Sequence, residues 1–234
     1  VTTSPTSPPS LYLYSEETGT LAPLIKAAPP ADLVFANMTA VRYFSRDGIE
    51  IPAYLTLPNE YDAKNPGPAI IMPHGGPWVR DMLSYDAWAQ FLASQGYVVL
   101  QPNYRGSTGY GNAFEGRGFG EWGKAMQTDL DDGADWLVSK GYAAKDRMCM
   151  VGGSYGGYAA LAATTIKGFN YQCAVAYAPV SDLSLWVNAA STSKAEKKAM
   201  QYRTVGSKKT KDIKKVSPAW LAKKAAMPLL IAHG

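Results

Sequence analysis

From residue 68 onward, short runs that are apolar throughout alternate with longer segments in which apolar residues recur at helical spacing. We predict strands at 68–73, 97–102, 147–152, 171–179 and 227–234, and helices near 84–95, 125–140 and 155–166. Strands that are apolar on both faces and separated by helices are typical of a parallel sheet with helices on both sides. The pattern therefore predicts an α/β fold with a mostly parallel, doubly wound sheet.

Upstream of residue 68 the apolar positions alternate with a period of two. The segment TAVRYFSRDGIEIPAYLTLP (39–58) contains two such runs joined at Asp47–Gly48, which indicates a hairpin. A second hairpin is predicted in LYLYSEETGTLAPLI (11–25), but it has no core of its own. With a linker at Pro29–Pro30, we assign residues 1–35 to a neighbouring domain and 36–234 to the main domain.

The composition is that of a globular chain. Its 234 residues are 47% hydrophobic, which suffices for one large domain. No apolar run approaches the roughly 18 residues of a membrane span. The first residues, VTTSPTSPPS, contain neither an initiator Met nor a signal-like core, so we expect a longer parent polypeptide, and the compartment stays open between cytoplasm and periplasm or secretion.

The two cysteines are predicted to have a structural role. Cys149 and Cys173 lie in apolar runs, and we expect buried free thiols rather than a disulfide.

Residues 194–215 hold nine Lys or Arg against two acidic residues, whereas the whole chain carries only +4. This stretch lacks the aromatic interleaving of a nucleic-acid surface. We therefore predict a solvated helical excursion at about 184–225, and no nucleic-acid partner.

The stretch MVGGSYGGYAAL (150–161) places Ser154 where a predicted strand ends and a helix begins. A serine in the G-x-S-x-G pattern at such a junction is typical of a nucleophile elbow. Gly152 and Gly156 are needed because side chains two residues before and after the serine would crowd the turn. We interpret Ser154 as a catalytic nucleophile.

A glycine turn, His74-Gly75-Gly76-Pro77, follows the strand at 68–73. Hydrolases of this architecture place an oxyanion-hole amide in such a loop, so the N–H groups of Gly76 and Tyr155 are predicted to converge on the oxyanion. His74 precedes the nucleophile, whereas this fold places its base after it. We therefore expect His74 to brace the loop.

Several longer stretches resemble one family. SRDGIEIPAYLTLP, HGGPWVRD, QPNYRGSTGYG, FGEWGKAMQTDLDDGADWLV, VGGSYGGYAAL, APVSDL and SPAW occur in the order and spacing of the catalytic domain of prolyl oligopeptidase family serine peptidases. The acylaminoacyl-peptidase and dipeptidyl-peptidase-like branch is the most similar. The resemblance covers about residues 36–234 and implies an α/β-hydrolase fold, and residues 11–25 resemble the last piece of the preceding β-propeller.

The resemblance also implies roles for individual residues. It supports Ser154 as nucleophile, with the Tyr155 and Gly76 amides as oxyanion donors. Val180 and Trp186, and with less support Leu183, would line an apolar pocket for the substrate residue before the cleaved bond; core packing is the alternative for each. The family positions matched by Arg105 and Asp129 are interpreted as structural supports.

The triad of this fold runs Ser, acid, His, and the acid is expected just after the strand at 227–234. His233 lies at the tip of that strand, and we interpret it as structural rather than as the base. We therefore expect the acid and base after Gly234, with the last strand and helix of the fold also beyond it, so that the domain as given is C-terminally incomplete.

The preferred hypothesis is a serine peptidase that cleaves peptide or acyl-peptide bonds through an acyl-enzyme on Ser154, with no cofactor or metal. A carboxylesterase acting on small esters and a non-catalytic scaffold or inactive fragment are the alternatives. A peptide substrate is the expected partner, and homo-oligomerisation stays open.

Overall fold

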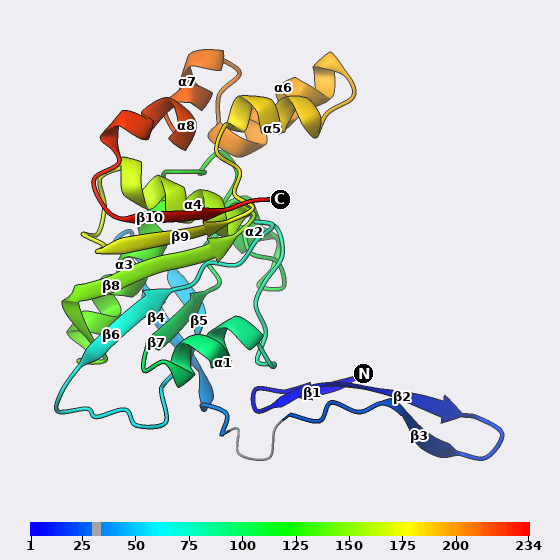
Figure 1. The fold of residues 1–234 in the computed structure, drawn as a ribbon. Coiled ribbons are helices and arrows are strands. Elements are labelled where there is room, and N and C mark those ends of the chain that lie inside the picture. The colour runs from blue at the N-terminus through cyan, green and yellow to red at the C-terminus, as the bar shows by residue number, and fades with distance from the viewer. Residues whose placement is uncertain (30–33) are drawn as a thin grey trace.

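The computed structural model describes residues 1–29 and 34–234, so part of the predicted Pro29–Pro30 linker lies outside the described residues. Its main body is built on a seven-stranded sheet with the order β10-β9-β8-β6-β7-β5-β4 (Figure 1). Strands β6 to β10 are parallel, and the β4–β5 hairpin is antiparallel at one edge. The strands are β4 (Met38–Phe44), β5 (Glu50–Thr56), β6 (Gly67–Ile71), β7 (Val98–Pro102), β8 (Ala143–Gly153), β9 (Cys173–Tyr177) and β10 (Leu229–Ala232). The mostly parallel sheet predicted from the sequence is confirmed.

The central strands are apolar on both faces because each face contributes to a separate core. Neighbouring residues of one strand point to opposite faces. Ile71 belongs to the larger core and Ile70 to the smaller one, and Leu100 and Val99 divide in the same way. These alternating contacts explain why the strands appear as continuous apolar runs in the sequence.

Helices on both sides of the sheet complete these cores. Helix α1 (Ala87–Ser94) contributes Ala89 to the smaller core, and it begins at Asp86, whose side chain accepts hydrogen bonds from the Trp88 and Ala89 amides. Helices α3 (Ala125–Ser139) and α4 (Tyr155–Thr165) contribute to the larger core. Helix α4 is buried almost all round, as an alanine-rich apolar helix must be. The sheet is therefore doubly wound.

The basic excursion is helical, as predicted, and it lies beside α4 between β9 and β10 in the chain (Figure 1). Helix α6 begins with a capping box made by Ser193 and Glu196 and ends at Gly206, which adopts a left-handed conformation. The helices of this part are α5 (Leu183–Ala189), α6 (Lys194–Val205), α7 (Thr210–Lys214), α8 (Pro218–Leu221) and a 3-10 turn (Ala222–Lys224); a further short helix, α2 (Asn112–Gly116), lies earlier in the chain.

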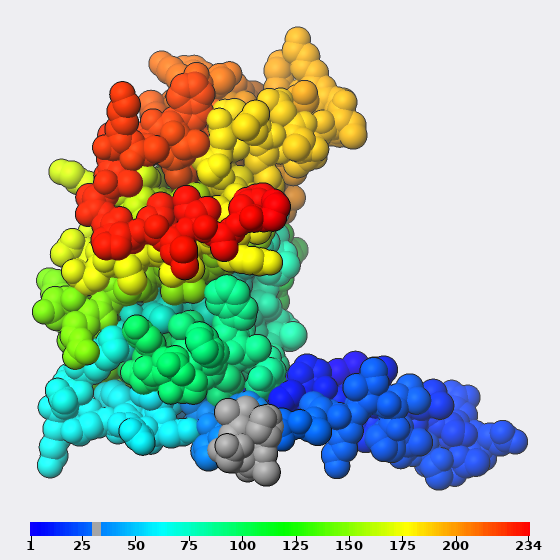
Figure 2. All heavy atoms as spheres, viewed as in Figure 1, coloured from blue at the N-terminus to red at the C-terminus, as the bar shows by residue number. Residues whose placement is uncertain are grey.

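A separate three-stranded sheet forms the N-terminal part. It consists of β1 (Thr2–Ser4), β2 (Ser7–Ser15) and β3 (Thr20–Ile25), and β2 and β3 form the predicted hairpin. This sheet projects from the body (Figure 2), and every residue of β3 is exposed. It has no core of its own, while its assignment to a β-propeller stays a prediction.

The expectation of two buried free thiols is wrong. Cys149 and Cys173 form a disulfide, and both residues are only partly buried. Cys149 of β8 and Cys173 of β9 are register partners on adjacent strands, with Cα atoms 4.7 Å apart. The register of the two strands brings the cysteine side chains together. That register cannot be read from the apolar pattern of either run alone.

Among residues 1–29 and 34–234, no helix is both long and apolar enough to cross a membrane.

Candidate functional site

Ser154 occupies a sharp turn between β8 and α4. Its φ of 56° and ψ of −117° lie in a region that non-glycine residues rarely adopt. The turn is fixed from both sides, because the Ser154 N–H donates to the Tyr177 carbonyl (3.0 Å) and the Tyr158 N–H donates to the Ser154 carbonyl (2.9 Å). Ser154 is nevertheless exposed. The strained turn therefore holds the serine at the surface.

Gly152 and Gly156 are required by close backbone packing. A Cβ on Gly152 would lie 2.5 Å from the backbone carbon and oxygen of Gly156, and one on Gly156 would collide with the carbonyl oxygen of Pro73. Pro73 follows β6, so the same contact brings the end of β6 against the elbow. The glycines thus allow two strand ends to approach each other around Ser154.

The glycine turn after β6 lies beside the nucleophile. A Cβ on Gly75 would be 3.5 Å from Ser154 Cβ and 3.9 Å from its Oγ. Gly76 has a φ of 104°, which favours glycine, and it is exposed.

Two backbone N–H groups in this region are free to bind an anion. Tyr155 is the first residue of α4, so its amide has no acceptor within the helix. Within residues 1–29 and 34–234, neither this amide nor that of Gly76 donates a hydrogen bond. The N-terminal end of α4 also favours negative charge.

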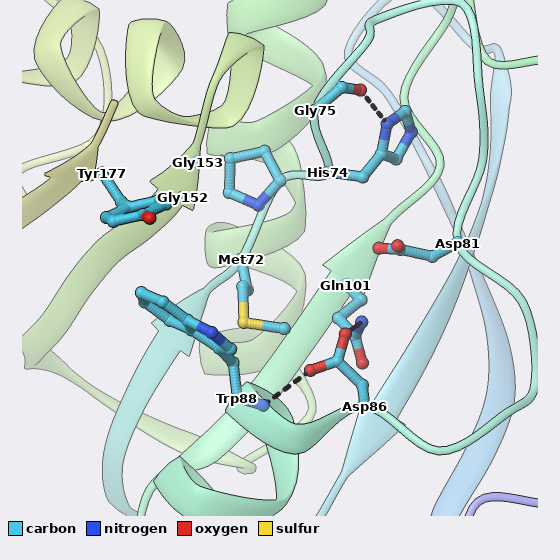
Figure 3. A pocket seen from close by; sticks show the side chains of 11 residues that line it. Met72, His74, Gly75, Asp81, Asp86, Trp88, Gln101, Gly152, Gly153 and Tyr177 are labelled. Carbon is cyan, nitrogen blue, oxygen red and sulfur yellow. Dashed lines mark hydrogen bonds between the residues drawn. The ribbon is translucent and has the colours of Figure 1, made fainter. Parts of the chain in front are cut away.

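A cavity of about 300 Å³ opens next to the elbow (Figure 3). Gly75, Gly152 and Gly153 form its wall on the side of the nucleophile, and Trp88 and Tyr177 form an aromatic wall. The other lining residues are Met72, Pro73, His74, Asp81, Asp86 and Gln101.

The polar end of the cavity is acidic. Burial raises the pKa of Asp81 to about 7, and the nearby charge of Asp86 adds to this shift. Asp81 Oδ2 and Gln101 Oε1 are buried and accept no hydrogen bond from the described residues. Sequence reasoning missed this cavity, although Asp81 belongs to the HGGPWVRD stretch.

His74 is buried in the wall of this cavity and contacts three groups. Nδ1 lies 2.7 Å from the Gly75 carbonyl oxygen, and Nε2 lies 2.9 Å from Ser107 Oγ. The Tyr104 hydroxyl donates to the His74 carbonyl (2.9 Å), and the two rings stack with centroids 4.4 Å apart. Burial lowers the pKa of His74 to about 4, against the smaller opposing effect of the Gly75 carbonyl. These contacts confirm that His74 braces the loop, and burial keeps its ring neutral.

The residues predicted to form the substrate pocket lie together on the segment after β9. Val180 and Trp186 are partly buried and pack against the larger core, and the Trp186 ring lies tilted against that of Trp122 with centroids 4.9 Å apart. Leu183 is fully buried in that core. Packing therefore accounts for Leu183, and the pocket role of Val180 and Trp186 stays a prediction.

Arg105 and Asp129 form a buried ionic network, which confirms their predicted structural role. Arg105 donates hydrogen bonds through its side chain to both carboxylate oxygens of Asp129 (2.6 and 2.8 Å) and to both of Asp47 (2.8 and 2.9 Å). The guanidinium and the Ser45 hydroxyl hold the pKa of Asp47 well below its usual range. This network ties the β4–β5 turn to α3 and to the chain after β7.

No histidine acts on Ser154 in this part of the chain. Across residues 1–29 and 34–234, Ser154 Oγ makes no hydrogen bond, and His74 uses its ring nitrogens elsewhere. His233 follows the last residue of β10 and is exposed, at the strand end where it was predicted.

Comparisons with known proteins cover nearly the whole chain. The model of the prolyl oligopeptidase family matches residues 83–234. Dipeptidyl aminopeptidase BIII of Pseudoxanthomonas mexicana is 36% identical over 95% of this chain and 34% of its own length.

Two solved structures are similar over almost all of the chain. A puromycin-hydrolysing peptidase of Mycobacterium tuberculosis superposes with a TM-score of 0.86 at 28% identity, covering 99% of this chain and 36% of that protein. An acylaminoacyl peptidase in complex with Z-Gly-Gly-Phe-chloromethyl ketone gives a TM-score of 0.79 at 26% identity, covering 98% of this chain and 37% of that one. The chain thus spans about a third of the length of these relatives.

Proposed function

Because the chain belongs to the prolyl oligopeptidase family and has the family's α/β-hydrolase fold, we propose that it is the catalytic domain of a serine peptidase with Ser154 as nucleophile. The observation that carries this proposal is the exposed Ser154 in its strained turn, flanked by two unpaired amides. The names of the relatives support peptides or acyl-peptides as substrates.

The proposed reaction proceeds in two steps. Ser154 Oγ attacks the scissile carbonyl, its proton passes to a general base, and the resulting oxyanion accepts hydrogen bonds from the Gly76 and Tyr155 amides. The base then protonates the leaving amine as the C–N bond breaks. Water hydrolyses the acyl-enzyme by the reverse sequence of proton transfers and regenerates the serine.

We place the base and its orienting acid C-terminal to Gly234. Gly153, Tyr177 and Ala232 are register partners across β8, β9 and β10. A loop that follows β10 would therefore leave the sheet at the same edge as Ser154, which supports this location for the acid. His74 is unsuited to be the base because it is buried with a lowered pKa, and its two ring nitrogens already contact the Gly75 carbonyl and Ser107 Oγ.

Val180 and Trp186 are proposed to line the pocket for the substrate residue that precedes the cleaved bond. Both are apolar and partly buried, and both lie just after β9, whose Tyr177 carbonyl accepts from the Ser154 amide. An apolar side chain of the substrate would suit this surface.

The nucleophile is tested by labelling the full-length protein with a fluorophosphonate. We expect stoichiometric labelling that the Ser154→Ala substitution abolishes, whereas Ser139→Ala, an exposed serine at the end of α3, leaves it unchanged. Labelling that persists in the Ser154→Ala protein would exclude this nucleophile.

A non-catalytic scaffold is the second candidate, favoured by the lack of a base at Ser154 within the described residues. It predicts that the full-length protein is not labelled at all, despite a correctly folded domain. Labelling of the wild type at Ser154 therefore separates the two functions.

A further inference from the structure

The polar end of the cavity beside Ser154 has more hydrogen-bond acceptors than donors. Gln101 is only 2% exposed, and its Nε2 donates to Asp86 Oδ2 (3.3 Å). Because a carboxylate oxygen only accepts, the amide nitrogen must face Asp86, and Gln101 Oε1 is left without a donor in the described part of the chain. The buried Oδ2 of Asp81 is in the same position. Buried acceptors are costly when unpaired, so this end of the cavity suits a ligand that donates hydrogen bonds.

The charges at this end favour a cation as the donor. Asp81 and Asp86 both line the cavity, whereas none of its described lining residues is a lysine or an arginine. The Trp88 and Ala89 amides hold the Asp86 carboxylate in place (2.9 Å each). Burial and the charge of Asp86 raise the pKa of Asp81 to about 7, and a cation bound between the two carboxylates would offset both effects.

The rest of the cavity suits an alkyl chain that carries such a cation. Trp88 and Tyr177 are 48% and 52% exposed, and their ring centroids lie 5.9 Å apart. These rings and the acidic groups lie on opposite sides of Met72 (Figure 3). Aromatic faces attract organic cations and pack against methylene groups. An ammonium group has three donors on a compact head, which matches the three acceptor groups of the polar end better than a planar guanidinium does.

The cavity lies across Ser154 from the predicted pocket for the residue before the cleaved bond. Val180 and Trp186 pack against the larger core, on one face of the sheet. Met72 belongs to the smaller core on the other face, where Trp88 lies on α1. A substrate whose residue before the cleaved bond contacts Val180 and Trp186 would therefore place its next residue toward the cavity.

We propose that the cavity is a subsite for the residue that follows the cleaved bond, and that Asp81, Asp86 and Gln101 bind the ammonium group of a lysine side chain there. This subsite rests on the proposed function, because it selects among substrates of Ser154. Norleucine has the alkyl stem of lysine without the ammonium group, so it would leave the acceptors unpaired. We expect kcat/KM to favour lysine over norleucine by at least about tenfold, the effect of a hydrogen bond to a charged group.

The experiment compares peptides that differ only at this residue, on full-length protein. The peptides are Ala-Phe-X-Ala and acetyl-Phe-X-Ala, with lysine or norleucine at X, and cleavage of the Phe–X bond is followed by mass spectrometry. The two series serve an enzyme that releases dipeptides and one that releases acylated residues. They give the ratio of kcat/KM for lysine to that for norleucine.

Three isosteric variants locate the effect. Asp81→Asn should bring the ratio close to one, because it removes a charge at nearly constant volume. Asp86→Asn should lower the ratio as well, and it remains foldable because asparagine caps a helix as well as aspartate does. Asp146→Asn is the matched control, since this exposed residue lies in β8 near the end remote from the elbow, and it should keep the wild-type ratio.

A second measurement needs no substrate and decides the matter if neither peptide series is cleaved. Butylamine, as the butylammonium ion, mimics the lysine side chain, and 1-butanol is its neutral counterpart. Butylamine in the cavity should slow fluorophosphonate labelling of Ser154 more than 1-butanol does at the same concentration. Asp81→Asn should remove this difference.

Three results would overturn the subsite. The first is an equal kcat/KM for lysine and norleucine, and the second is a lysine preference that survives both Asp81→Asn and Asp86→Asn. The third is a shift in thermal unfolding of the Asp81→Asn protein with an unchanged ratio, which would mean that residues beyond Gly234 fill the cavity. A wild type that is not labelled overturns the proposed function together with the subsite, whereas a labelled wild type without the preference overturns only the subsite.

Discussion

At the scale of single residues, the site depends on where a side chain is missing. Gly152 and Gly156 touch each other, and Gly156 also touches the carbonyl of Pro73. Gly153 lies between them in the chain, yet the nearest atom to a Cβ built there is 3.6 Å away, in the ring of Tyr177. Neighbouring glycines of one motif therefore have different requirements, which single substitutions can separate.

We predict that Gly156→Ala destabilises the protein by at least about 1–3 kcal/mol, the usual cost of overpacking, because the added methyl meets backbone that cannot move aside. The same change should disrupt the elbow and lower fluorophosphonate labelling. Gly153→Ala is the matched control and should fold with near wild-type stability, since its methyl makes an ordinary contact. Chemical denaturation of both proteins measures the difference, and equal stabilities would contradict the steric argument.

At the scale of elements, buried polar contacts join parts that the chain keeps far apart. Arg105 follows β7, Asp47 lies in the β4–β5 turn, and Asp129 lies on α3. The partly buried disulfide between Cys149 and Cys173 joins the adjacent strands β8 and β9 covalently. The ionic network therefore ties the antiparallel edge to α3, and the disulfide ties the nucleophile strand to β9.

We predict that Arg105→Ala lowers the free energy of unfolding by about 3–5 kcal/mol, because it leaves the fully buried Asp129 carboxylate without its ionic partner. The exposed pair of Arg42 and Glu50 is the control, and Arg42→Ala should cost less than about 1 kcal/mol. Urea denaturation followed by tryptophan fluorescence compares the two. A cost for Arg105→Ala as small as that for Arg42→Ala would show that the network contributes little.

At the scale of the whole molecule, the N-terminal sheet is only loosely attached to the main body. Strand β3 is exposed throughout, and few polar contacts connect the N-terminal sheet with α1 and the loop before it. Among these, the Tyr85 N–H donates to Thr3 Oγ1 (3.4 Å) and Gln90 Nε2 donates to the Pro5 carbonyl (3.0 Å). The body therefore has its core without this sheet, and the division near residue 35 stays a prediction.

We predict that a chain lacking residues 1–25 unfolds within about 2–4 °C of the intact chain, since a loss of about 1 kcal/mol shifts Tm by that amount at this size. Differential scanning calorimetry of both chains under the same buffer conditions makes the comparison. A drop of 10 °C or more would instead make the sheet part of the body's folding unit.

The main elements and the elbow were predictable because their causes are local. Apolar runs and helical periods act over a few residues, and the glycines around Ser154 are required by the turn that contains them. The helices α2, α5, α7 and α8 were not predicted individually, because four to seven residues hold too little periodicity. The prediction of two free thiols was wrong, because the pairing of Cys149 with Cys173 follows from the register of two strands.

The amino-acid sequence by itself determined the doubly wound pattern, the position of Ser154 in a strained turn and the glycine loop beside it, because short-range sterics and periodicity impose all three. Only the tertiary structure decided which groups brace that loop. His74, Tyr104 and Ser107 meet across about thirty residues of chain, and the acidic cavity collects residues from several strand ends. Such contacts depend on how strands pair and helices pack, which no local stretch of sequence specifies.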